Sequence, residues 1–272
     1  TLLPYLRPAA LQFNGWGWPM TCGHRRIAGF LTCHGLDPTP DADADAEFTE
    51  PLVRLASPPT FFCRAAFAQR IAPTAGEFGI EPGDRVISCL QRVYKLRPEF
   101  DRLAAGILEA VPSARLVLTG DAHPRIQRAL ESRLRGALGE AFDRVRFTSD
   151  LDRPRYLGIL SRADLALDPP GYGGGANTVY DAMGVGTPIV TRPGEFHRGR
   201  WAAMTLRRLG LTECLGDDPA ELAVRLLTDP EQARDVRARI AARAPSLFED
   251  ETVVREHREF FLESIERSRM GR

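Results

Sequence analysis

The stretch DLALDPPGYGGGANTVYDAMGVGTPIVTRPG, residues 164–194, carries the pattern that decides the fold of this chain. Its apolar run at 165–167 ends in an aspartate and two prolines, which predicts a short buried strand. Four glycines follow between residues 171 and 175, and they allow the backbone to turn tightly and to approach a ligand. Residues 179–185 then predict the first turns of a helix, and residues 188–191 predict the next strand.

The start of this helix predicts a site for an anion. Asn177 and Thr178 are residue types that cap helices. Backbone N–H groups at a helix start lack partners within the helix and lie at the positive end of its dipole. A helix that follows a parallel strand directs these groups out of the carboxyl edge of the sheet, which favours phosphate. The loop has no GxGxxG in the expected place and no GxxxxGK[ST], so nicotinamide and P-loop sites are disfavoured.

Strand and helix patterns alternate from Asp84 to the end of the chain. Short apolar runs predict strands, and apolar residues at helical spacing predict helices. Besides the opening stretch, the predicted strands cover 85–90, 114–119 and 143–148, and the predicted helices cover 97–111, 124–138, 153–162, 198–209, 220–227, 231–244 and 250–269. This alternation implies a doubly wound parallel sheet, whose ligands bind at the carboxyl ends of the strands.

Residues 1–63 show a less regular pattern. The predicted strands here cover residues 9–13, 26–33 and 60–63. The loop at 15–23 is rich in glycine and tryptophan, and it either seals an edge of the core or faces a ligand. An Asp-x-Asp-x-Asp spacing begins at Asp41, but it lacks the glycine and the terminal glutamate of a calcium loop. We therefore expect residues 37–59 to form a solvated acidic linker.

The composition is that of an ordinary globular protein, with 43% apolar and 26% charged residues. Lys and Arg together number 36, as do Asp and Glu, so no overall field favours nucleic acid or an anionic membrane. No apolar run approaches the roughly 20 residues that cross a bilayer. The five cysteines are scattered and the histidines are dispersed, which disfavours disulfides and a metal site. We expect a reducing, cytoplasmic setting and no metal.

Three polar residues lie near the predicted carboxyl edge. Lys95 follows the strand at 85–90, where it either neutralises phosphate as a point charge or is simply solvated. Asp181 either accepts a sugar hydroxyl of a nucleotide or favours the helix start by its charge. His197 follows the strand at 188–191, and an exposed loop position is expected for it.

Five separate blocks of the chain resemble, in order, the C-terminal part of the O-GlcNAc transferase/SPINDLY family, glycosyltransferase family 41, in its bacterial form. The blocks are RPAALQFNGWGWPMTCG at 7–23, QRVYKLRPEF at 91–100, VPSARLVL at 111–118, GGANTVYD at 174–181 and GTPIVT at 186–191. Any one block is weak, but five in register cover nearly the whole chain.

The resemblance implies a GT-B fold, in which two Rossmann-like domains enclose the site. Residues 84–272 are then the donor-binding domain with its C-terminal helix, residues 65–83 a linker, and residues 1–64 the C-terminal part of the other domain. The family transfers a sugar from a nucleotide donor to Ser or Thr of proteins, with inversion and without a metal. The implied partners are a nucleotide sugar, with UDP-GlcNAc favoured, and a protein or peptide acceptor. No other cofactor is implied.

The resemblance also implies site residues. Lys95 matches the catalytic lysine that binds the donor diphosphate and assists its departure. Thr178 matches a phosphate-binding threonine, and Asp181 matches the acidic residue that holds the ribose. Tyr156 stands where animal members stack a histidine on the base. The remaining implied donor-binding residues are Gly17, Trp18, Pro19, Gln91, Gly174, Gly175 and Asn177.

Alternatives remain open at this point. Related enzymes use GDP-fucose, or use UDP-glucose to modify asparagine, and a non-catalytic nucleotide-sugar-binding or interaction module is a further possibility. The chain begins with Thr1 in mid-pattern, and the family's upstream histidines and helical repeats do not occur in it. We therefore expect a fragment or a processed segment whose active site is incomplete.

Overall fold

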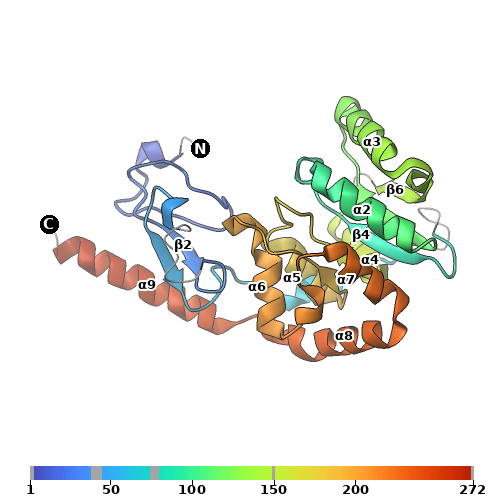
Figure 1. Cartoon of the computed structure of the whole chain (residues 1–272). Helices are drawn as coiled ribbons and strands as arrows, with labels where there is room; N and C mark the ends of the chain where they lie inside the picture. The colour runs from blue at the N-terminus through green and yellow to red at the C-terminus, as the bar shows by residue number, and fades with distance from the viewer. Residues whose placement is uncertain (1–2, 38–44, 74–79, 149–150, 271–272) are drawn as a thin grey trace. The chain divides into compact units, whose positions relative to one another are not determined.

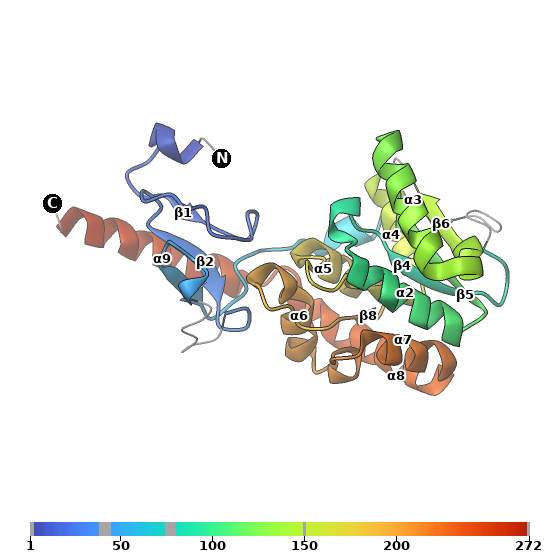
Figure 2. The same ribbon diagram turned by 45° about the horizontal axis from the view of Figure 1, so that its top comes forward.

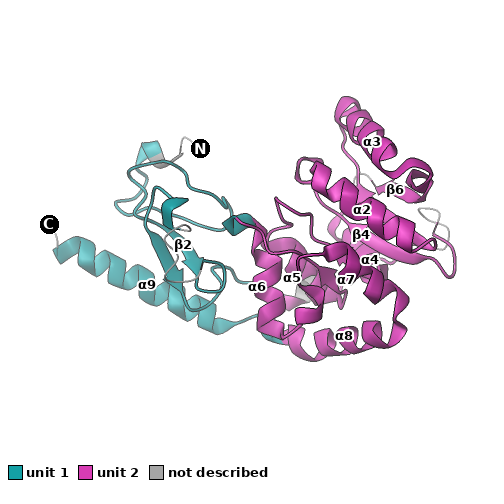
Figure 3. Ribbon diagram, in the orientation of Figure 1, with its two compact units in different colours: residues 1–63, 196–198, 246–272 teal, residues 64–195, 199–245 magenta. Residues whose placement is uncertain are grey.

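A computed structural model describes residues 3–37, 45–73, 80–148 and 151–270 of the chain. Its internal contacts divide the chain into two compact units, coloured in Figure 3. The first unit comprises Thr1–Cys63, Phe196–Arg198 and Ser246–Arg272, and the second comprises Arg64–Glu195 and Gly199–Pro245.

The second unit is built on a sheet of five parallel strands in the order β6-β5-β4-β7-β8. Its strands are β4 (Arg85–Cys89), β5 (Ala114–Thr119), β6 (Val145–Thr148), β7 (Leu165–Leu167) and β8 (Ile189–Val190). The central strands are almost entirely buried, because helices cover both faces of a doubly wound sheet. Ile87 pairs in register with Leu116 on one side and with Leu165 on the other. The predicted doubly wound parallel sheet is thus confirmed.

Seven α-helices and several short 3-10 turns of the second unit lie among the described residues. The helices are α2 (Pro98–Ala110), α3 (Pro124–Leu138), α4 (Arg153–Arg162), α5 (Ala176–Val185), α6 (Trp201–Leu209), α7 (Pro219–Thr228) and α8 (Pro230–Arg243). The 3-10 turns are η2 (Arg64–Phe67), η4 (Val93–Lys95), η5 (Gly139–Arg144), η7 (Thr212–Cys214) and the first half of η8 (Ala244–Leu247). Helices α2 and α3 pack together, as do α4 and α5 (Figure 1, Figure 2). Ile159 of α4 packs on Val86 and Val117, so α4 closes one face of the sheet.

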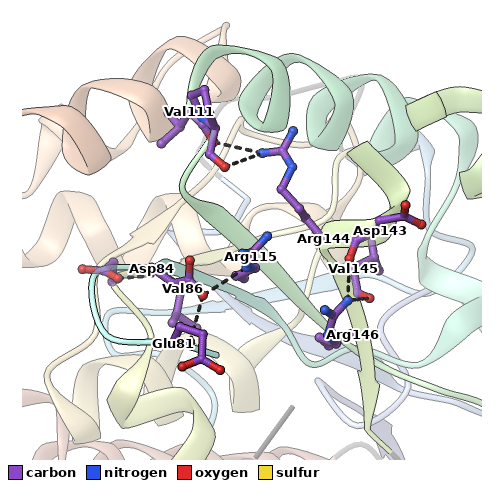
Figure 4. A network of polar contacts seen from close by, with 11 residues as sticks. Glu81, Asp84, Val86, Val111, Arg115, Asp143, Arg144, Val145 and Arg146 are labelled. Carbon is purple, nitrogen blue, oxygen red and sulfur yellow. Dashed lines mark hydrogen bonds and ion pairs between the residues drawn. The ribbon is translucent and has the colours of Figure 1, made fainter. Parts of the chain in front are cut away.

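Arginines close the amino edge of this sheet (Figure 4). Asp84 accepts hydrogen bonds from Arg115 Nε at 3.0 Å and from the backbone N–H of Glu81 at 2.9 Å. Arg144 donates to the carbonyls of Leu108 at 2.7 Å and Val111 at 3.1 Å, where α2 ends. These contacts satisfy backbone groups that the helix end leaves unpaired, so this edge serves stability.

The first unit contains a smaller parallel sheet in the order β1-β2-β3. The strands are β1 (Phe13–Asn14), β2 (Gly29–Cys33) and β3 (Leu52–Leu55). The unit also contains the 3-10 turn η1 (Leu3–Leu6), helix α9 (Glu251–Met270) and the turn η6 (His197–Gly199), whose last residue falls in the second unit. Helix α9 packs with the N-terminal residues: the rings of Phe13 and Phe260 meet edge to face with centroids 5.0 Å apart. Glu256 of α9 also accepts the backbone N–H of Ser57 at 2.8 Å.

Most predicted elements of the second unit are confirmed to within three residues at either end, but α5 begins earlier than predicted. Gly175, at φ 77°, is the N-cap residue, so Asn177 and Thr178 lie inside the first turn and do not cap the helix. Glycine adopts this φ readily but has no side chain, so the helix start is left without a side-chain cap. The helix expected from residue 198 instead starts later, at Trp201, after the turn η6.

Several predictions for the first unit are wrong. Of the strand expected at 9–13, only Phe13 belongs to β1. Residues 60–63 form no strand, because the backbone turns after Pro58, where Thr60 N–H bonds to the Pro58 carbonyl at 2.8 Å. Strand β3 lies inside the stretch expected to be a linker; three apolar residues after Pro51 outweigh the acidic composition around them. The Asp-x-Asp spacing falls largely outside the described residues. Helix α9, expected at the end of the donor-binding domain, groups by its contacts with the N-terminal residues.

The segment that leads into the second sheet crosses α4 at a glycine. A Cβ atom built at Gly158 would lie 1.7 Å from the carbonyl oxygen of Ile71, whose N–H bonds to Pro154 at 3.0 Å. We expect Gly158→Ala to lower the free energy of unfolding by at least about 2 kcal/mol, since backbone must move. Gly136→Ala in α3, where a Cβ meets nothing within 4 Å, is the matched control and should stabilise by up to about 1 kcal/mol. Urea unfolding of both variants measures this, and equal effects would contradict the crossing.

Candidate functional site

The candidate site lies where the strand order of the second sheet reverses. The chain leaves β4 toward β5 on one side, and it leaves β7 toward β8 on the other. Strands β4 and β7 are neighbours, so their carboxyl ends bring together the loops that follow them. Such a switch point is where ligands bind in doubly wound folds. The two loops here are residues 90–97 and residues 168–175.

The glycine loop after β7 turns sharply into α5. Gly171, Gly173 and Gly175 adopt φ values of 81°, 80° and 77°, which side chains disfavour. Helix α5 then starts at Ala176 with no side-chain cap on its first turn. Its first N–H groups are thus available to an anion at the positive end of the helix.

Lys95 reaches this loop from η4. Its Nζ donates to the Gly174 carbonyl at 2.8 Å and to Gln91 Oε1 at 2.9 Å. The Nε2 of the buried Gln91 in turn donates to Thr178 Oγ1 in the first turn of α5. The predicted approach of Lys95 to the glycine loop is confirmed, and the solvated alternative is wrong. Burial lowers the pKa of Lys95 from its ordinary value, while the charge of Asp168 opposes that shift.

The chain contains only one lysine, and it is Lys95. The other 35 of its 36 basic residues are arginines. This count is a signal that the sequence carries without any structure, and it marks position 95 as the place where an ammonium, rather than a guanidinium, is present.

Gly174 is the residue through which the two loops touch. A Cβ atom there would lie 2.7 Å from Asp168 Oδ1 and 2.8 Å from Gln91 Nε2. Only glycine therefore lets both side chains approach the loop.

Asp168, at the end of β7, is a site residue that the sequence analysis missed. Its Oδ1 accepts the Gly174 N–H, and its Oδ2 accepts the Thr191 hydroxyl at 2.7 Å. Burial raises the pKa of Asp168 to about 6, against the lowering effect of those two hydrogen bonds and of Lys95. The signal was present, because Asp168 directly follows an apolar run and so lies at the carboxyl edge of the sheet, near which Lys95 was predicted to lie.

Asp181 forms a second polar cluster on α5. Its carboxylate is buried and accepts from Arg153 of α4 through two nitrogens, at 2.6 and 2.8 Å. Tyr156 of α4 belongs to the same cluster, and the Arg153 guanidinium lies 5.7 Å from the centre of its ring. Burial raises the pKa of Asp181, and Arg153 counteracts this. The predicted residues Tyr156, Thr178 and Asp181 are thus brought together, and Arg153 is a partner that the sequence analysis did not single out.

The remaining predicted residues of the second unit lie at the same helix start. Asn177 is exposed on the first turn of α5, and Gly175 is half-buried before it.

Gly17, Trp18 and Pro19 lie in the first unit. They form a turn in which Trp18 N–H bonds to the Gly15 carbonyl at 2.9 Å, and the Trp18 side chain is exposed. Glu50, a second residue that the sequence analysis missed, holds the far end of this loop. It accepts from the Thr21 hydroxyl at 2.7 Å and the Cys22 N–H at 3.1 Å. Burial alone would raise the pKa of Glu50, but hydrogen bonds such as these lower it to about 2.

His197 is buried in the first unit, so its expected exposure is wrong. Its Nδ1 lies 2.6 Å from Asp37 Oδ2, and its ring packs edge-on against Phe30 with centroids 5.1 Å apart. Long-range packing, which a loop sequence does not reveal, places it there.

In the described ranges, no three His, Cys, Asp or Glu side chains gather as they would around a metal ion. Among the same residues, no helix combines the length and the apolar character that a membrane span requires.

Removing Arg153 should leave the buried Asp181 carboxylate without its cation. We expect Arg153→Gln to lower the free energy of unfolding by about 1–3 kcal/mol, because an unpaired buried charge is costly. Without Arg153, the folded-state pKa of Asp181 rises further above that of the unfolded chain. The free energy of unfolding then falls as pH rises, so the variant should be less stable at pH 8 than at pH 5.

Arg155→Gln on the exposed side of α4 is the matched control, and adding Asp181→Asn to Arg153→Gln should recover stability. Thermal unfolding at the two pH values measures this. A loss independent of pH, or one equal to that of the control, would contradict the pairing.

The model of glycosyl transferase family 41 matches residues 66–256, more than half of the chain. A probable UDP-N-acetylglucosamine–peptide N-acetylglucosaminyltransferase SEC of Arabidopsis thaliana is 26% identical over 216 residues, which cover 76% of this chain and 21% of that protein. A UDP-N-acetylglucosamine–peptide N-acetylglucosaminyltransferase of Caenorhabditis elegans is 29% identical over 171 residues, or 58% of this chain and 14% of that protein. The chain therefore spans about a fifth or less of these relatives' length.

Solved structures agree with the family match. A mutant O-GlcNAc transferase of Thermobaculum terrenum superposes with a TM-score of 0.76 at 26% identity, over 94% of this chain and 48% of that one. A sucrose-phosphate synthase of Thermosynechococcus elongatus (TM-score 0.62, 18% identity, 88% of this chain and 59% of that one) shares the fold. So does Anabaena HepE in complex with UDP and glucose (0.60, 15%, 88% and 64%). The fold is of the Rossmann-like GT-B type, and the chain belongs to glycosyltransferase family 41.

Proposed function

We propose that this chain is the donor-binding part of a glycosyltransferase that moves a sugar from a nucleoside diphosphate to a protein side chain. The observation that carries the proposal is the position of the Lys95 ammonium, 2.8 Å from the Gly174 carbonyl beside the uncapped start of α5. A lysine and a helix start that meet at a switch point suit a diphosphate.

The chemistry explains why a diphosphate needs such a site. The acceptor oxygen attacks the anomeric carbon, the bond from that carbon to the phosphate oxygen breaks, and its electron pair stays on the nucleoside diphosphate. The acceptor proton passes to a base. Fixed donors stabilise the negative charge that develops on the departing phosphate, and here these are the first N–H groups of α5, the Thr178 hydroxyl and Lys95.

The other predicted residues receive proposed roles around this centre. Asp181 accepts a ribose hydroxyl while Arg153 balances its charge, and Tyr156 stacks on the base. For Gly17, Trp18 and Pro19 of the first unit, the family resemblance supports a role in binding the donor sugar. None of the five cysteines, all of which lie among the described residues, forms a disulfide, as a reducing, cytoplasmic setting would require.

UDP-GlcNAc is the proposed donor and a Ser or Thr hydroxyl of a protein the proposed acceptor. The relatives from Arabidopsis and C. elegans are named for transfer from UDP-N-acetylglucosamine to peptides, and this supports both choices. GDP-fucose and UDP-glucose are the competing donors, and a module that binds the donor without catalysis is the competing class.

Calorimetry with the purified chain tests the donor. We expect UDP-GlcNAc to bind more tightly than UDP-glucose or GDP-fucose, and UDP alone to compete with it. Tighter binding of GDP-fucose would identify GDP-fucose as the donor instead. If neither UDP nor any of the three nucleotide sugars binds, the proposal is overturned. Donor binding without transfer or donor hydrolysis by the full-length protein would favour the non-catalytic module.

Replacing Lys95 should affect turnover more than binding. We expect Lys95→Ala in the full-length protein to lower kcat by at least about 100-fold, since it removes a donor to the departing phosphate. The Kd for UDP-GlcNAc should rise by less than about tenfold, because the helix start still binds the phosphates. Arg234→Ala, which removes an exposed cation from α8, is the control and should change neither value. Equal losses in kcat and in affinity would contradict a role in leaving-group departure.

A further inference from the structure

The carboxylate of Asp168 is not used by the proposed function. It is buried at the end of β7, and its two oxygens accept from the Gly174 N–H and the Thr191 hydroxyl. Both of its oxygens are therefore engaged by groups that hold the loop and the strand end. Its neighbours nevertheless belong to the site, because Gly174 also accepts the hydrogen bond of Lys95.

The negative charge of Asp168 is costly for the fold. Burial raises its pKa to about 6, above the ordinary 3.8. The folded chain thus binds this proton more tightly than the unfolded chain, and stability falls as pH rises from about 4 to about 6. A neutral side chain of the same shape would avoid this cost, so stability alone does not explain a carboxylate here.

Lys95 provides an explanation for the charge. Its two hydrogen-bond acceptors, the Gly174 carbonyl and the Gln91 amide, are neutral. Asp168 and Cys89 are the ionisable groups whose charge acts on Lys95. Burial raises the pKa of the Cys89 thiol, which is therefore neutral near pH 7. Of these groups, only Asp168 is anionic when the site has to hold an ammonium.

We propose that Asp168 is a positioning residue that fixes the glycine loop through Gly174 and supplies the counter-charge that keeps Lys95 an ammonium before the donor binds. The benefit of this role rests on the proposed function: when the donor binds, its phosphates meet a lysine that is already charged. The ring of Tyr172, 5.6 Å from Lys95 Nζ, adds a weaker attraction for the same cation.

Gly174 couples the two parts of this role. Its N–H is held by Asp168, and its carbonyl accepts from Lys95. When phosphate oxygens replace the Gly174 carbonyl as partners of Lys95, Asp168 still holds the loop in place. The N–H groups at the start of α5 thus keep their direction through the exchange.

The single lysine makes the proposal directly measurable. A chain labelled with ¹³C and ¹⁵N lysine gives one lysine side-chain signal, that of Lys95. We expect this signal to titrate in two steps: a small inflection near pH 6, as Asp168 ionises, and a main step as Lys95 loses its proton. Asp168→Asn should abolish the inflection and move the main step to lower pH, because the opposite charge is gone.

Matched variants control for burial and for folding. Asp101→Asn removes an equally buried carboxylate that pairs with Arg133 in α2 and α3, and it should leave the Lys95 titration unchanged. Thr191→Val keeps the carboxylate but removes a hydrogen bond that lowers its pKa, so the inflection should move to higher pH. This second variant tests the proposal even if Asp168→Asn does not fold.

The outcomes separate this proposal from the proposed function. A Lys95 signal that shows no inflection near pH 6 and does not respond to Thr191→Val overturns the role of Asp168. So does a folded Asp168→Asn protein with an unchanged main step. UDP added to the wild-type chain should shift the Lys95 signal and raise its titration midpoint. If UDP leaves the signal unchanged while the variants behave as expected, the proposed function fails and the role of Asp168 in charging Lys95 stands.

Discussion

The hydrogen bond from Lys95 to the Gly174 carbonyl joins two loops that are far apart in the sequence and adjacent in the sheet. It exists because β4 and β7 are neighbours in the strand order while their connections leave in opposite directions. The loops cannot meet unless this order is formed, and the order cannot be read from either loop alone. Sheet topology is therefore the constraint on which the site depends.

The site is built from polar groups that satisfy one another, and all of those named here except Lys95 and Arg153 are buried. Gln91 joins Lys95 to Thr178, Asp168 holds Gly174, and Asp181 holds Arg153. Such groups cannot relax toward water, so they keep their directions when a ligand arrives. The opposite edge of the sheet differs, because its arginines pair with Asp84 and with backbone carbonyls and support the fold. The two edges thus separate stability from binding.

Strong local patterns made most of the second unit predictable. Apolar runs and helical spacing predicted its strands and helices, and the rule that ligands bind at strand ends placed Lys95 at the glycine loop. Contacts between distant segments were not predictable in this way. Arg153 and Asp181 meet across two helices, and His197 is buried by Asp37 and Phe30, about 160 residues away in sequence. Strand β3 was not predicted because its four residues are too few to show a clear strand pattern within the acidic stretch around them.

The chemistry of position 95 explains why an ammonium suits it in a chain that otherwise uses arginine. A guanidinium keeps its proton at any physiological pH and spreads its donors over a plane. An ammonium is compact enough to bond both the Gly174 carbonyl and Gln91 Oε1, at 2.8 and 2.9 Å, in a site where Gly174 already has no room for a Cβ. The pKa of an ammonium can also be adjusted by its surroundings. Here burial lowers the pKa of Lys95 and the charge of Asp168 raises it. An arginine would keep its proton without help, whereas the charge of a partly buried lysine depends on its neighbours, so a carboxylate such as Asp168 matters more beside a lysine.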